Sequence, residues 1–305
     1  GTRIRVGLLG INGTLAPKTE APTEAWKGPE GVLENLSALI SRVLAAVPAP
    51  VAGIGIAAAG QIHPETQAVV YAPNLNWRDV PLRTRLEARF NLPVWVENDV
   101  RAAAWGEFRF GAGRGVRSLV AVFVGTGVGS GAILGGRLWR GAFNAAGEIG
   151  HTQVVPDGLP CGCGQRGCLE AYCSGSGFIR RFEGALAAGN RTTLRDRTGG
   201  DAAKLTALQV AQAAAEGDPL AQEFWEDALR YLTLALTNAV TLLNPERLVL
   251  GGGVVEAVPD LQEAVTTAIE TRATLMARAV TVHRAALGDW AGAVGAAALA
   301  AEAAH

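Results

Sequence analysis

The periods at which apolar and polar residues alternate predict an ordered series of strands and helices. Arg3–Leu9 alternates and then runs apolar, and Asn12-Gly13 follows it, which predicts a strand entering a hairpin turn. Glu30–Val47 carries apolar residues at helical spacing and is predicted to be an amphipathic helix. Apolar stretches predict strands at 51–58 and 94–96, and helical patterns cover 81–90 and 102–108.

A second block with the same alternation begins at an apolar strand, Ser118–Val124. This strand runs into the glycine-rich stretch Gly125–Gly131, and a further strand is expected at 132–134. Asp218-Pro219 marks a helix start, with Asp as N-cap and Pro at the first helical position, and that helix is expected to reach about residue 243. A strand at 247–250 ends in three glycines, and further helices are expected at 174–188, 207–216, 260–277 and 290–304.

Because strands and helices alternate in both blocks, the chain is predicted to form two α/β domains with a cleft between them. The length of 305 residues agrees with two domains of about 100–200 residues each. The predicted boundaries are a small N-terminal domain of residues 1–117, joined by the C-terminal helix 290–305, and a larger domain of residues 118–289.

Charge and hydropathy exclude several classes of partner. The formal net charge is −1, so there is no electrostatic argument for binding nucleic acid or a membrane surface. No apolar run approaches the roughly 20 residues that span a bilayer. A basic and apolar N-terminal signal is also lacking, and we therefore expect a cytoplasmic protein.

All four cysteines fall within one short stretch, which indicates a metal site rather than a disulfide framework. His151, Cys161, Cys163 and Cys168 form a Cys₃His set that suits a tetrahedral structural zinc, and nearby glycines would let the ligands converge. Four protein ligands leave no open position, so the metal should organise rather than catalyse. The alternative is a patch of buried free cysteines. Cys173 is expected to be a small buried side chain outside the site.

Two glycine-rich stretches are candidates for contact with a nucleotide. Gly125, Thr126, Gly127 and Gly129 follow an apolar strand, and small residues there let backbone N–H groups and a hydroxyl approach phosphate oxygens. The stretch is not a dinucleotide fingerprint, because the third glycine of that pattern would fall on a serine. Gly251, Gly252 and Gly253 offer backbone at another strand end. A purely structural hairpin and a buried strand-to-helix turn are the respective alternatives.

The triplet Glu97-Asn98-Asp99 stands at a strand end and carries candidate catalytic groups. An asparagine side chain can both donate to and accept from a sugar hydroxyl. A carboxylate in a closed cleft can accept the proton of an attacking hydroxyl. The alternative for Asp99 is a cap on the following helix. Glu148 adds a second carboxylate, three residues before His151.

Together these motifs resemble the ROK family of bacterial sugar kinases and sugar-responsive repressors. The resemblance covers nearly the whole chain. It rests on the motifs named above and on four further segments, Ala72-Pro73-Asn74-Leu75, the stretch from Cys161 to Glu170, Asn244-Pro245 and Ala291–Ala297.

The resemblance implies an actin-like, ribonuclease-H-like fold with an interdomain cleft. It implies an ATP-dependent kinase, with Mg²⁺, that phosphorylates the 6-hydroxyl of glucose or a related sugar, and a homodimer. Asp99 would be the base. The sugar would be held by Asn74, Asn98, Asp99, Glu148, His151 and Glu170, with His151 also binding zinc. The two glycine-rich stretches would face ATP.

Three departures from the family pattern stand out. Gly1, Thr2 and Arg3 match only the end of the first phosphate motif, D-x-G-G-T-K/R, so we expect that an N-terminal segment with its Asp is omitted from the chain. Ala59-Gly60 replaces the usual Pro-Gly, and Arg101 replaces an Asn two residues after the base. The rival interpretations are a sugar-sensing regulator with a preceding DNA-binding domain, and a sugar-binding protein with altered catalysis.

Overall fold

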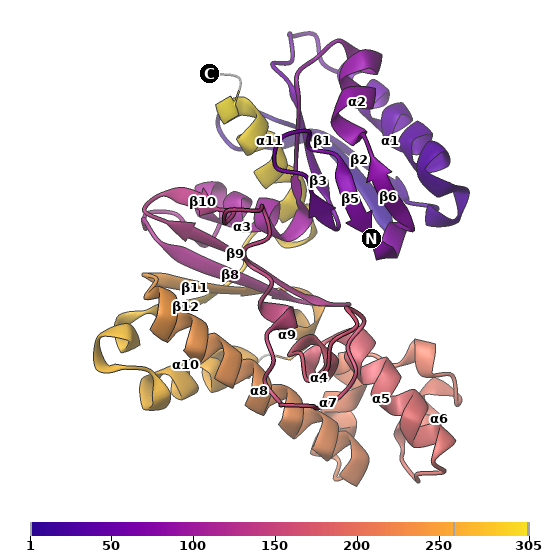
Figure 1. Ribbon diagram of the computed structural model, residues 1–305, viewed down its shortest axis with the longest axis vertical. Helices are drawn as coiled ribbons and strands as arrows, with labels where there is room; N and C mark the ends of the chain where they lie inside the picture. The colour runs from indigo at the N-terminus through magenta and orange to yellow at the C-terminus, as the bar shows by residue number, and fades with distance from the viewer. Residues whose placement is uncertain (1, 259, 304–305) are drawn as a thin grey trace. The chain divides into compact units, whose positions relative to one another are not determined.

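The computed structural model describes residues 2–258 and 260–303, and the chain divides into two compact units (Figure 1). Unit 1 comprises the residues up to Arg117, Gly131–Gly147 and the residues from Ala286 onward. Unit 2 comprises Ser118–Ser130 and Glu148–Ala285. The predicted mixed α/β class is confirmed. The domain boundaries drawn from the sequence stay a prediction; they differ from this division by placing 131–147 and 286–289 in the second domain.

Unit 1 begins with the predicted hairpin, in which β1 (Arg3–Leu9) pairs antiparallel with β2 (Leu15–Pro22). Gly13 has a φ of 82°, a value at which glycine is favoured because it has no Cβ. The side chain of Asn12 accepts the N–H of Thr14 at 3.0 Å and so stabilises the turn. The connection spans residues 10–14 and is closed by the N–H of Gly13, which donates to the carbonyl of Gly10 at 2.9 Å, so the Asn-Gly pair lies within the predicted turn.

The rest of unit 1 is a set of small sheets with helices packed on them. β3 (Ile54–Ala58) runs parallel to β7 (Val94–Asn98), and β4 (Gln61–Ile62), β5 (Val69–Ala72) and β6 (Trp77–Val80) form an antiparallel sheet. The helices are α1 (Gly28–Ala45), α2 (Leu82–Phe90), α3 (Asp99–Phe110) and α11 (Ala291–Ala303). Apolar residues from α1 and these strands share one core. The short strands β4 to β6 were not predicted, because runs of two to four residues carry almost no periodic signal.

Helices α3 and α11 pack closely because glycines replace side chains where they meet. A Cβ on Gly295 would overlap the carbonyl of Ala102, and a Cβ on Gly106 would lie 2.6 Å from the carbonyl oxygen of Ala291. Backbone atoms cannot move aside as a flexible side chain can, so the two helices would have to separate.

Gly295→Ala is therefore expected to destabilise the protein by about 1–3 kcal/mol, the usual cost of overpacking. Gly292→Ala in the same helix is the matched control, since its Cβ would meet the nearest atom, the Ala57 methyl, at an ordinary 3.5 Å. Urea unfolding of both variants checks the difference. Equal stability of the two variants would contradict the close contact at Gly295.

Unit 2 contains most of a sheet with the strand order β10-β9-β8-β11-β12. β8 (Leu119–Val124), β11 (Arg247–Gly251) and β12 (Thr281–Arg284) are mutually parallel. β9 (Val128–Leu134) is followed by β10 (Arg137–Trp139), and the division between the units falls within β9. The residues of β8 and β11 at the centre of the sheet are almost all fully buried, as expected for parallel strands.

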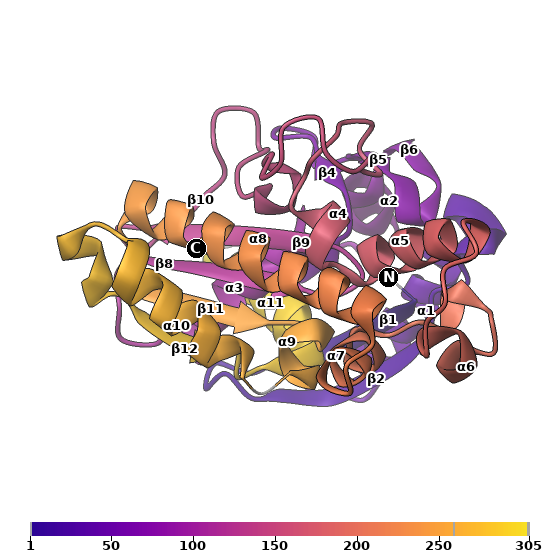
Figure 2. The ribbon, with the colours of Figure 1, turned by 90° about the horizontal axis from the view of Figure 1, so that it is seen from below.

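Helices cover this sheet. The longest, α8 (Pro219–Leu243), begins as predicted, with the Asp218 side chain accepting the N–H of Ala221. It lies beside α10 (Leu261–Arg272), as Figures 1 and 2 show. The helix expected at 260–277 ends early at Arg272, and a 3₁₀ turn follows it at Leu275–Ala279. The remaining helices are α4 (Glu170–Cys173), α5 (Gly175–Ala187), α6 (Leu194–Thr198), α7 (Ala207–Ala215) and α9 (Gly253–Ala257). None of the helices in the described part of the chain is both long and apolar enough to cross a bilayer.

Candidate functional site

The junction between β7 and α3 in unit 1 presents the carboxylate of Asp99. The helix cap here is Asn98, whose side-chain oxygen accepts the N–H groups of Val100 and Arg101 at 3.1 and 3.0 Å. The interpretation of Asp99 as the cap is therefore wrong. Instead, one oxygen of Asp99 accepts the N–H of Val100 at 2.9 Å and the amide of Asn98 at 3.2 Å. The helix start thus orients the carboxylate.

Burial is the largest influence on Asp99 and raises the pKa of its carboxyl group above the ordinary value of 3.8. The hydrogen bond from the N–H of Val100 offsets part of this rise in pKa. A carboxylate with a raised pKa is a stronger proton acceptor when ionised, which suits a general base.

Gly60 is needed for the geometry around Asn98. Its φ is 107°, and a Cβ there would overlap the backbone of Tyr71. Its carbonyl accepts the second donor of the Asn98 amide at 3.2 Å. The replacement of Pro-Gly by Ala59-Gly60 therefore retains the glycine that holds Asn98. Asn74, the other predicted sugar ligand of unit 1, is exposed on a 3₁₀ turn, Pro73–Leu75.

The glycine-rich stretch of unit 2 is a tight turn followed at once by strand. β9 begins at Val128 and not at residue 132, so the predicted phosphate loop is confined to Gly125, Thr126 and Gly127. Gly129 lies within the strand. Thr126 is exposed at the tip of the turn.

The second glycine stretch lies beside this turn. Gly251 pairs with Phe123 at the carboxyl ends of the parallel strands β11 and β8. A Cβ on Gly252, which has a φ of 91°, would meet the carbonyl oxygen of Val124 at 2.5 Å. Gly253 begins α9. The structure therefore brings both predicted nucleotide segments to one edge of the sheet, where open α/β sheets bind ligands.

Glu170 connects this turn to the cysteine loop. One of its carboxylate oxygens accepts the N–H of Val128 at 3.0 Å, and the other lies 3.9 Å from the sulfur of Cys161. The N–H groups of Gly175 and Ser176 donate to the carbonyls of Gly125 and Thr126 at 2.8 and 3.0 Å. The segment that follows the cysteine loop thus holds the glycine turn in place.

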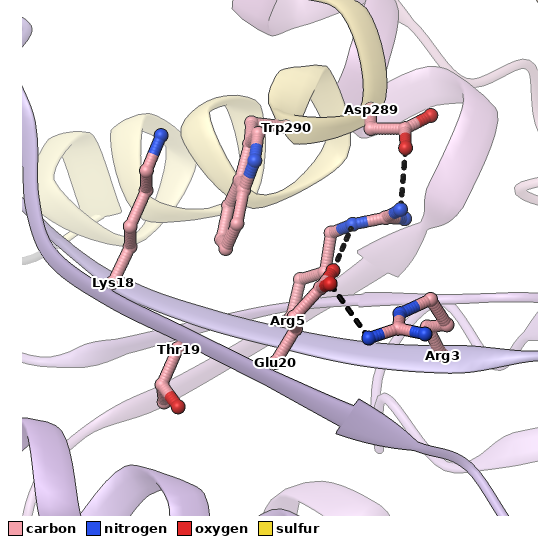
Figure 3. A pocket seen from close by; sticks show the side chains of 7 residues that line it. All are labelled: Arg3, Arg5, Lys18, Thr19, Glu20, Asp289 and Trp290. Carbon is pink, nitrogen blue, oxygen red and sulfur yellow. Dashed lines mark hydrogen bonds and ion pairs between the residues drawn. The ribbon is translucent and has the colours of Figure 1, made fainter.

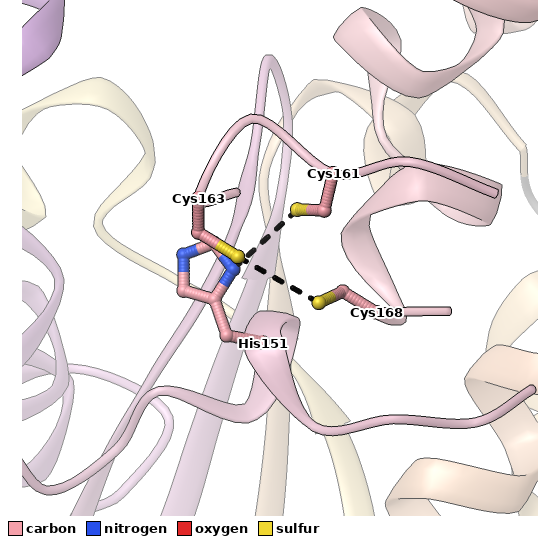
Figure 4. A group of neighbouring side chains, drawn as sticks. All are labelled: His151, Cys161, Cys163 and Cys168. Carbon is pink, nitrogen blue, oxygen red and sulfur yellow. Dashed lines mark hydrogen bonds between the residues drawn. The ribbon is translucent and has the colours of Figure 1, made fainter. Parts of the chain in front are cut away.

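The four predicted metal ligands converge in unit 2 (Figure 4). Their nitrogen and sulfur atoms all lie within 4.8 Å of one another. The sulfurs of Cys163 and Cys168 are 3.7 Å apart, and the sulfur of Cys161 is 3.7 Å from Nδ1 of His151. A disulfide would require about 2.05 Å between sulfurs. Tetrahedral zinc, with Zn–S bonds of about 2.3 Å, places its ligand atoms about 3.5–3.8 Å apart.

Local backbone geometry explains why the loop closes. Gly164 and Gly167 have φ values of 88° and 74°, and a Cβ on Gly167 would overlap the carbonyl of Val155. Gly162 faces open space and is not required by packing. Glu148 is exposed and immediately precedes the 3₁₀ turn Ile149–His151, which carries the candidate histidine ligand.

Cys173 lies outside the cluster, as predicted. It is buried in α4, and its thiol donates to the carbonyl of Leu169 at 3.4 Å. Burial raises the pKa of this thiol, which keeps it protonated and inert.

The N-terminal candidates belong to the β1–β2 hairpin of unit 1 or directly precede it. Gly1 is outside the described residues, and Thr2 is exposed before β1. Arg3 forms an ion pair with Glu20 at 2.6 Å and lines an open pocket with Arg5, Lys18, Thr19, Glu20, Asp289 and Trp290 (Figure 3). In this arrangement the guanidinium of Arg3 neutralises a carboxylate of its own hairpin.

Sequence reasoning missed the role of Glu97 and left the direction of Arg101 open. Both side chains are buried and paired with each other. The available signal was their spacing of four residues, which is compatible with an ion pair on a helix but does not establish one across a strand-to-helix junction.

Comparison with known proteins identifies the family. The family model described as "ROK family" matches residues 1–303. A glucokinase of Streptomyces coelicolor is 36% identical over 83% of this chain and 79% of its own length. A glucokinase of Halalkalibacterium halodurans is 35% identical over 97% of this chain and 91% of its own length.

A solved structure agrees with these sequence matches. The ROK family glucokinase from Streptomyces griseus, in complex with glucose and AMPPNP, superposes with a TM-score of 0.81 at 34% identity. The superposition covers 99% of this chain and 96% of the other, which confirms the expected actin-like, two-domain α/β fold. This chain therefore belongs to the ROK family.

Proposed function

We propose that this protein is an ATP-dependent hexose kinase that transfers the γ-phosphoryl group of ATP to the 6-hydroxyl of glucose or a closely related sugar. The observation that carries the proposal is the oriented, partly buried carboxylate of Asp99 at the end of β7. The glucokinases that align along most of this chain support the same reaction.

In the proposed reaction, the sugar oxygen forms a bond to the γ-phosphorus as the bond to the β-γ bridging oxygen breaks. The hydroxyl proton passes to the carboxylate of Asp99, and ADP leaves. Because the transition state of phosphoryl transfer is loose, orientation of the hydroxyl matters more than the strength of the base. The hydrogen bonds from Asn98 and Val100 supply that orientation.

The remaining sugar contacts are assigned to further polar side chains. The proposed partners of the other sugar hydroxyls are Asn74, Asn98, Glu148, His151 and Glu170. Asparagine and carboxylate groups suit this task because a hydroxyl both donates and accepts.

The nucleotide is assigned to the edge where β8 and β11 end. Phosphate oxygens would accept hydrogen bonds from the N–H groups and the hydroxyl of Gly125, Thr126 and Gly127. The backbone of the second glycine stretch, residues 251–253, would lie against the nucleotide. Gly1, Thr2, Arg3 and Gly129 are further candidates. Mg²⁺ bound to ATP would neutralise charge on the phosphates.

Zinc is the proposed occupant of the Cys₃His cluster. Two of the ligand separations are 3.7 Å, as in a tetrahedral site, and all four ligand atoms lie within 4.8 Å of one another. Its role would be structural: the loop that it closes carries His151 and leads into Glu170.

A sugar-sensing regulator is not better supported, because the relatives reported above are kinases that align along most of their own length. A homodimer and a cytoplasmic location also belong to the proposal. Light scattering coupled to size-exclusion chromatography tests the dimer.

The test of function is a coupled assay of ADP release with glucose, mannose, fructose, N-acetylglucosamine and N-acetylmannosamine. Glucose is expected to have the highest kcat/KM, by about tenfold or more over the N-acetylated sugars. ³¹P NMR of the product should show a 6-phosphate. Absence of sugar-dependent ADP release with all five sugars would overturn the proposal.

A further inference from the structure

A carboxylate in the interior of unit 1 is held between two guanidinium groups. Glu97, near the end of β7, is 1% exposed, and Arg101, in the first turn of α3, is 2% exposed. Nε of Arg101 donates to one oxygen of Glu97 at 2.8 Å, and Nε of Arg140 donates to the other at 2.6 Å. The N–H of Asn98 also donates to Glu97, at 2.9 Å.

Arg101 extends this pairing to the segment 140–147. Its two terminal nitrogens donate to the carbonyl of Ala146 at 3.3 Å and to the side-chain oxygen of Asn144 at 3.2 Å. The amide of Asn144 in turn donates to the carbonyl of Ile62 at 2.8 Å. We use the name Glu97 clamp for the set of four side chains Glu97, Arg101, Arg140 and Asn144.

Polar bonds, and not apolar burial, hold this segment. Phe143, its only large apolar residue, is 87% exposed, and none of the residues from 140 to 147 is buried. Asn144 has a φ of 56°, a conformation that a non-glycine residue rarely adopts without a specific contact. Arg140 additionally lies over the ring of Trp95, 5.8 Å from its centroid.

The position of the clamp relates it to the proposed sugar site. Its two central members, Glu97 and Arg101, flank Asn98 and Asp99 in the chain. The segment that it anchors ends at Gly147, immediately before Glu148. Burial of an ion pair costs desolvation and is weak evidence for stability, whereas a role in selecting one conformation is consistent with this cost.

We propose that Arg101 is a positioning residue, which through the Glu97 clamp fixes segment 140–147 relative to the Asn98-Asp99 turn and thereby sets the affinity for sugar. This inference rests on the proposed function for its link to sugar. Arg101 need not touch the substrate; it acts through Asn144 and Ala146.

The test compares Arg101→Met, Arg101→Lys and a control, Arg181→Met. Methionine keeps most of the side-chain volume and removes every donor, while lysine keeps the charge and part of the hydrogen bonding. Arg181 is a matched control because it is also a largely buried arginine, 7% exposed, paired with Asp227 in unit 2.

Arg101→Met is expected to raise the sugar KM, and the sugar Kd measured by calorimetry without ATP, by about tenfold, with the KM for ATP within about twofold. Arg101→Lys should recover part of the sugar affinity. Hydrogen exchange at the amide of Ala146, which bonds to the carbonyl of Arg140 at 3.0 Å, should accelerate by about tenfold in Arg101→Met, by a smaller factor in Arg101→Lys, and not in Arg181→Met.

Sugar affinity and Ala146 exchange that stay within about twofold of the wild type in both Arg101 variants would overturn the inference. So would an equal loss of sugar affinity in Arg181→Met, since that loss would reflect stability alone. If Arg101→Met fails to fold, Arg101→Lys carries the same readouts. If the wild type binds no sugar, the proposed function fails, and the exchange at Ala146 still decides whether Arg101 anchors the segment.

Discussion

Asp99→Asn is expected to lower kcat by about a thousandfold, the middle of the range for losing a general base, while the sugar Kd stays within a few-fold. Asparagine has the same shape and can keep the hydrogen bond from the N–H of Val100. It cannot accept a proton from the sugar hydroxyl. Steady-state kinetics together with calorimetric titration of sugar separates the two effects. A variant with near-normal kcat would show that Asp99 is not the base.

The same substitution is expected to stabilise the fold at neutral pH. Burial raises the pKa of Asp99 in the folded state, so its contribution to stability is fully present below the ordinary pKa of 3.8 and is lost as pH rises through the raised pKa. At neutral pH the carboxylate of Asp99 is therefore ionised in surroundings that destabilise its charged form, which lowers the stability of the folded protein. Asp99→Asn should raise Tm at pH 7, and the gain should disappear toward pH 3.

Asp218→Asn provides the opposite control. Burial alone would raise the pKa of Asp218. The pKa is nevertheless lowered, because Ala221, Thr193 and Thr192 all donate hydrogen bonds to the carboxylate. Its contribution to stability is therefore present above the ordinary pKa and lost as pH falls through the lowered value. Asp218→Asn should lower Tm most at neutral pH. A gain in Tm at pH 7 for Asp218→Asn, or a loss for Asp99→Asn, would contradict these assignments.

Loss of the metal is expected to weaken the binding of both substrates and to destabilise the fold. Cys161→Ser should reduce bound zinc from one per chain to near zero and lower the free energy of unfolding by several kcal/mol, because the binding energy of a structural metal is folding energy. The KM for ATP should rise along with that for sugar. The reason is Glu170, which follows the cysteine loop and accepts the N–H of Val128 beside the glycine turn.

The measurements are metal analysis, Tm with and without a chelator, and hydrogen exchange at the amide of Val128. Cys173→Ala is the matched control, since Cys173 is buried in α4 outside the cluster and should leave the zinc content at one per chain. A purified protein that contains no zinc, and whose Tm is indifferent to the chelator, would contradict the assignment of this cluster.

The elements and motifs that depend on local chemistry were predictable from the sequence. The hairpin at Asn12-Gly13, the start of α8 at Asp218 and the parallel strands ending at Asn98 and Gly251 all appear where their patterns placed them. The convergence of His151 with three cysteines was predictable for the same reason, because the four candidate ligands lie close together in the chain and their types suit one metal.

Patterns with two local solutions either left an alternative open or misplaced an element. Asp and Asn both cap helices, and the structure gives that position to Asn98, which leaves Asp99 free to present its carboxylate. A glycine-rich stretch suits either a loop or a strand, and pairing with the neighbouring strand extends β9 back to Val128.

Residue types and their spacing were thus enough to identify the family and the α/β class and to select the candidate metal ligands and the candidate base, since each selection depends on neighbours in the chain. Two features depended on partners far away in the chain. The inward direction of Arg101 involves a bond to Ala146, 45 residues away, and the link between the cysteine loop and the glycine turn involves a bond between Glu170 and Val128, 42 residues apart. Such contacts are decided by tertiary packing, because only the folded backbone brings a buried guanidinium to the carboxylate and carbonyls that can replace its water.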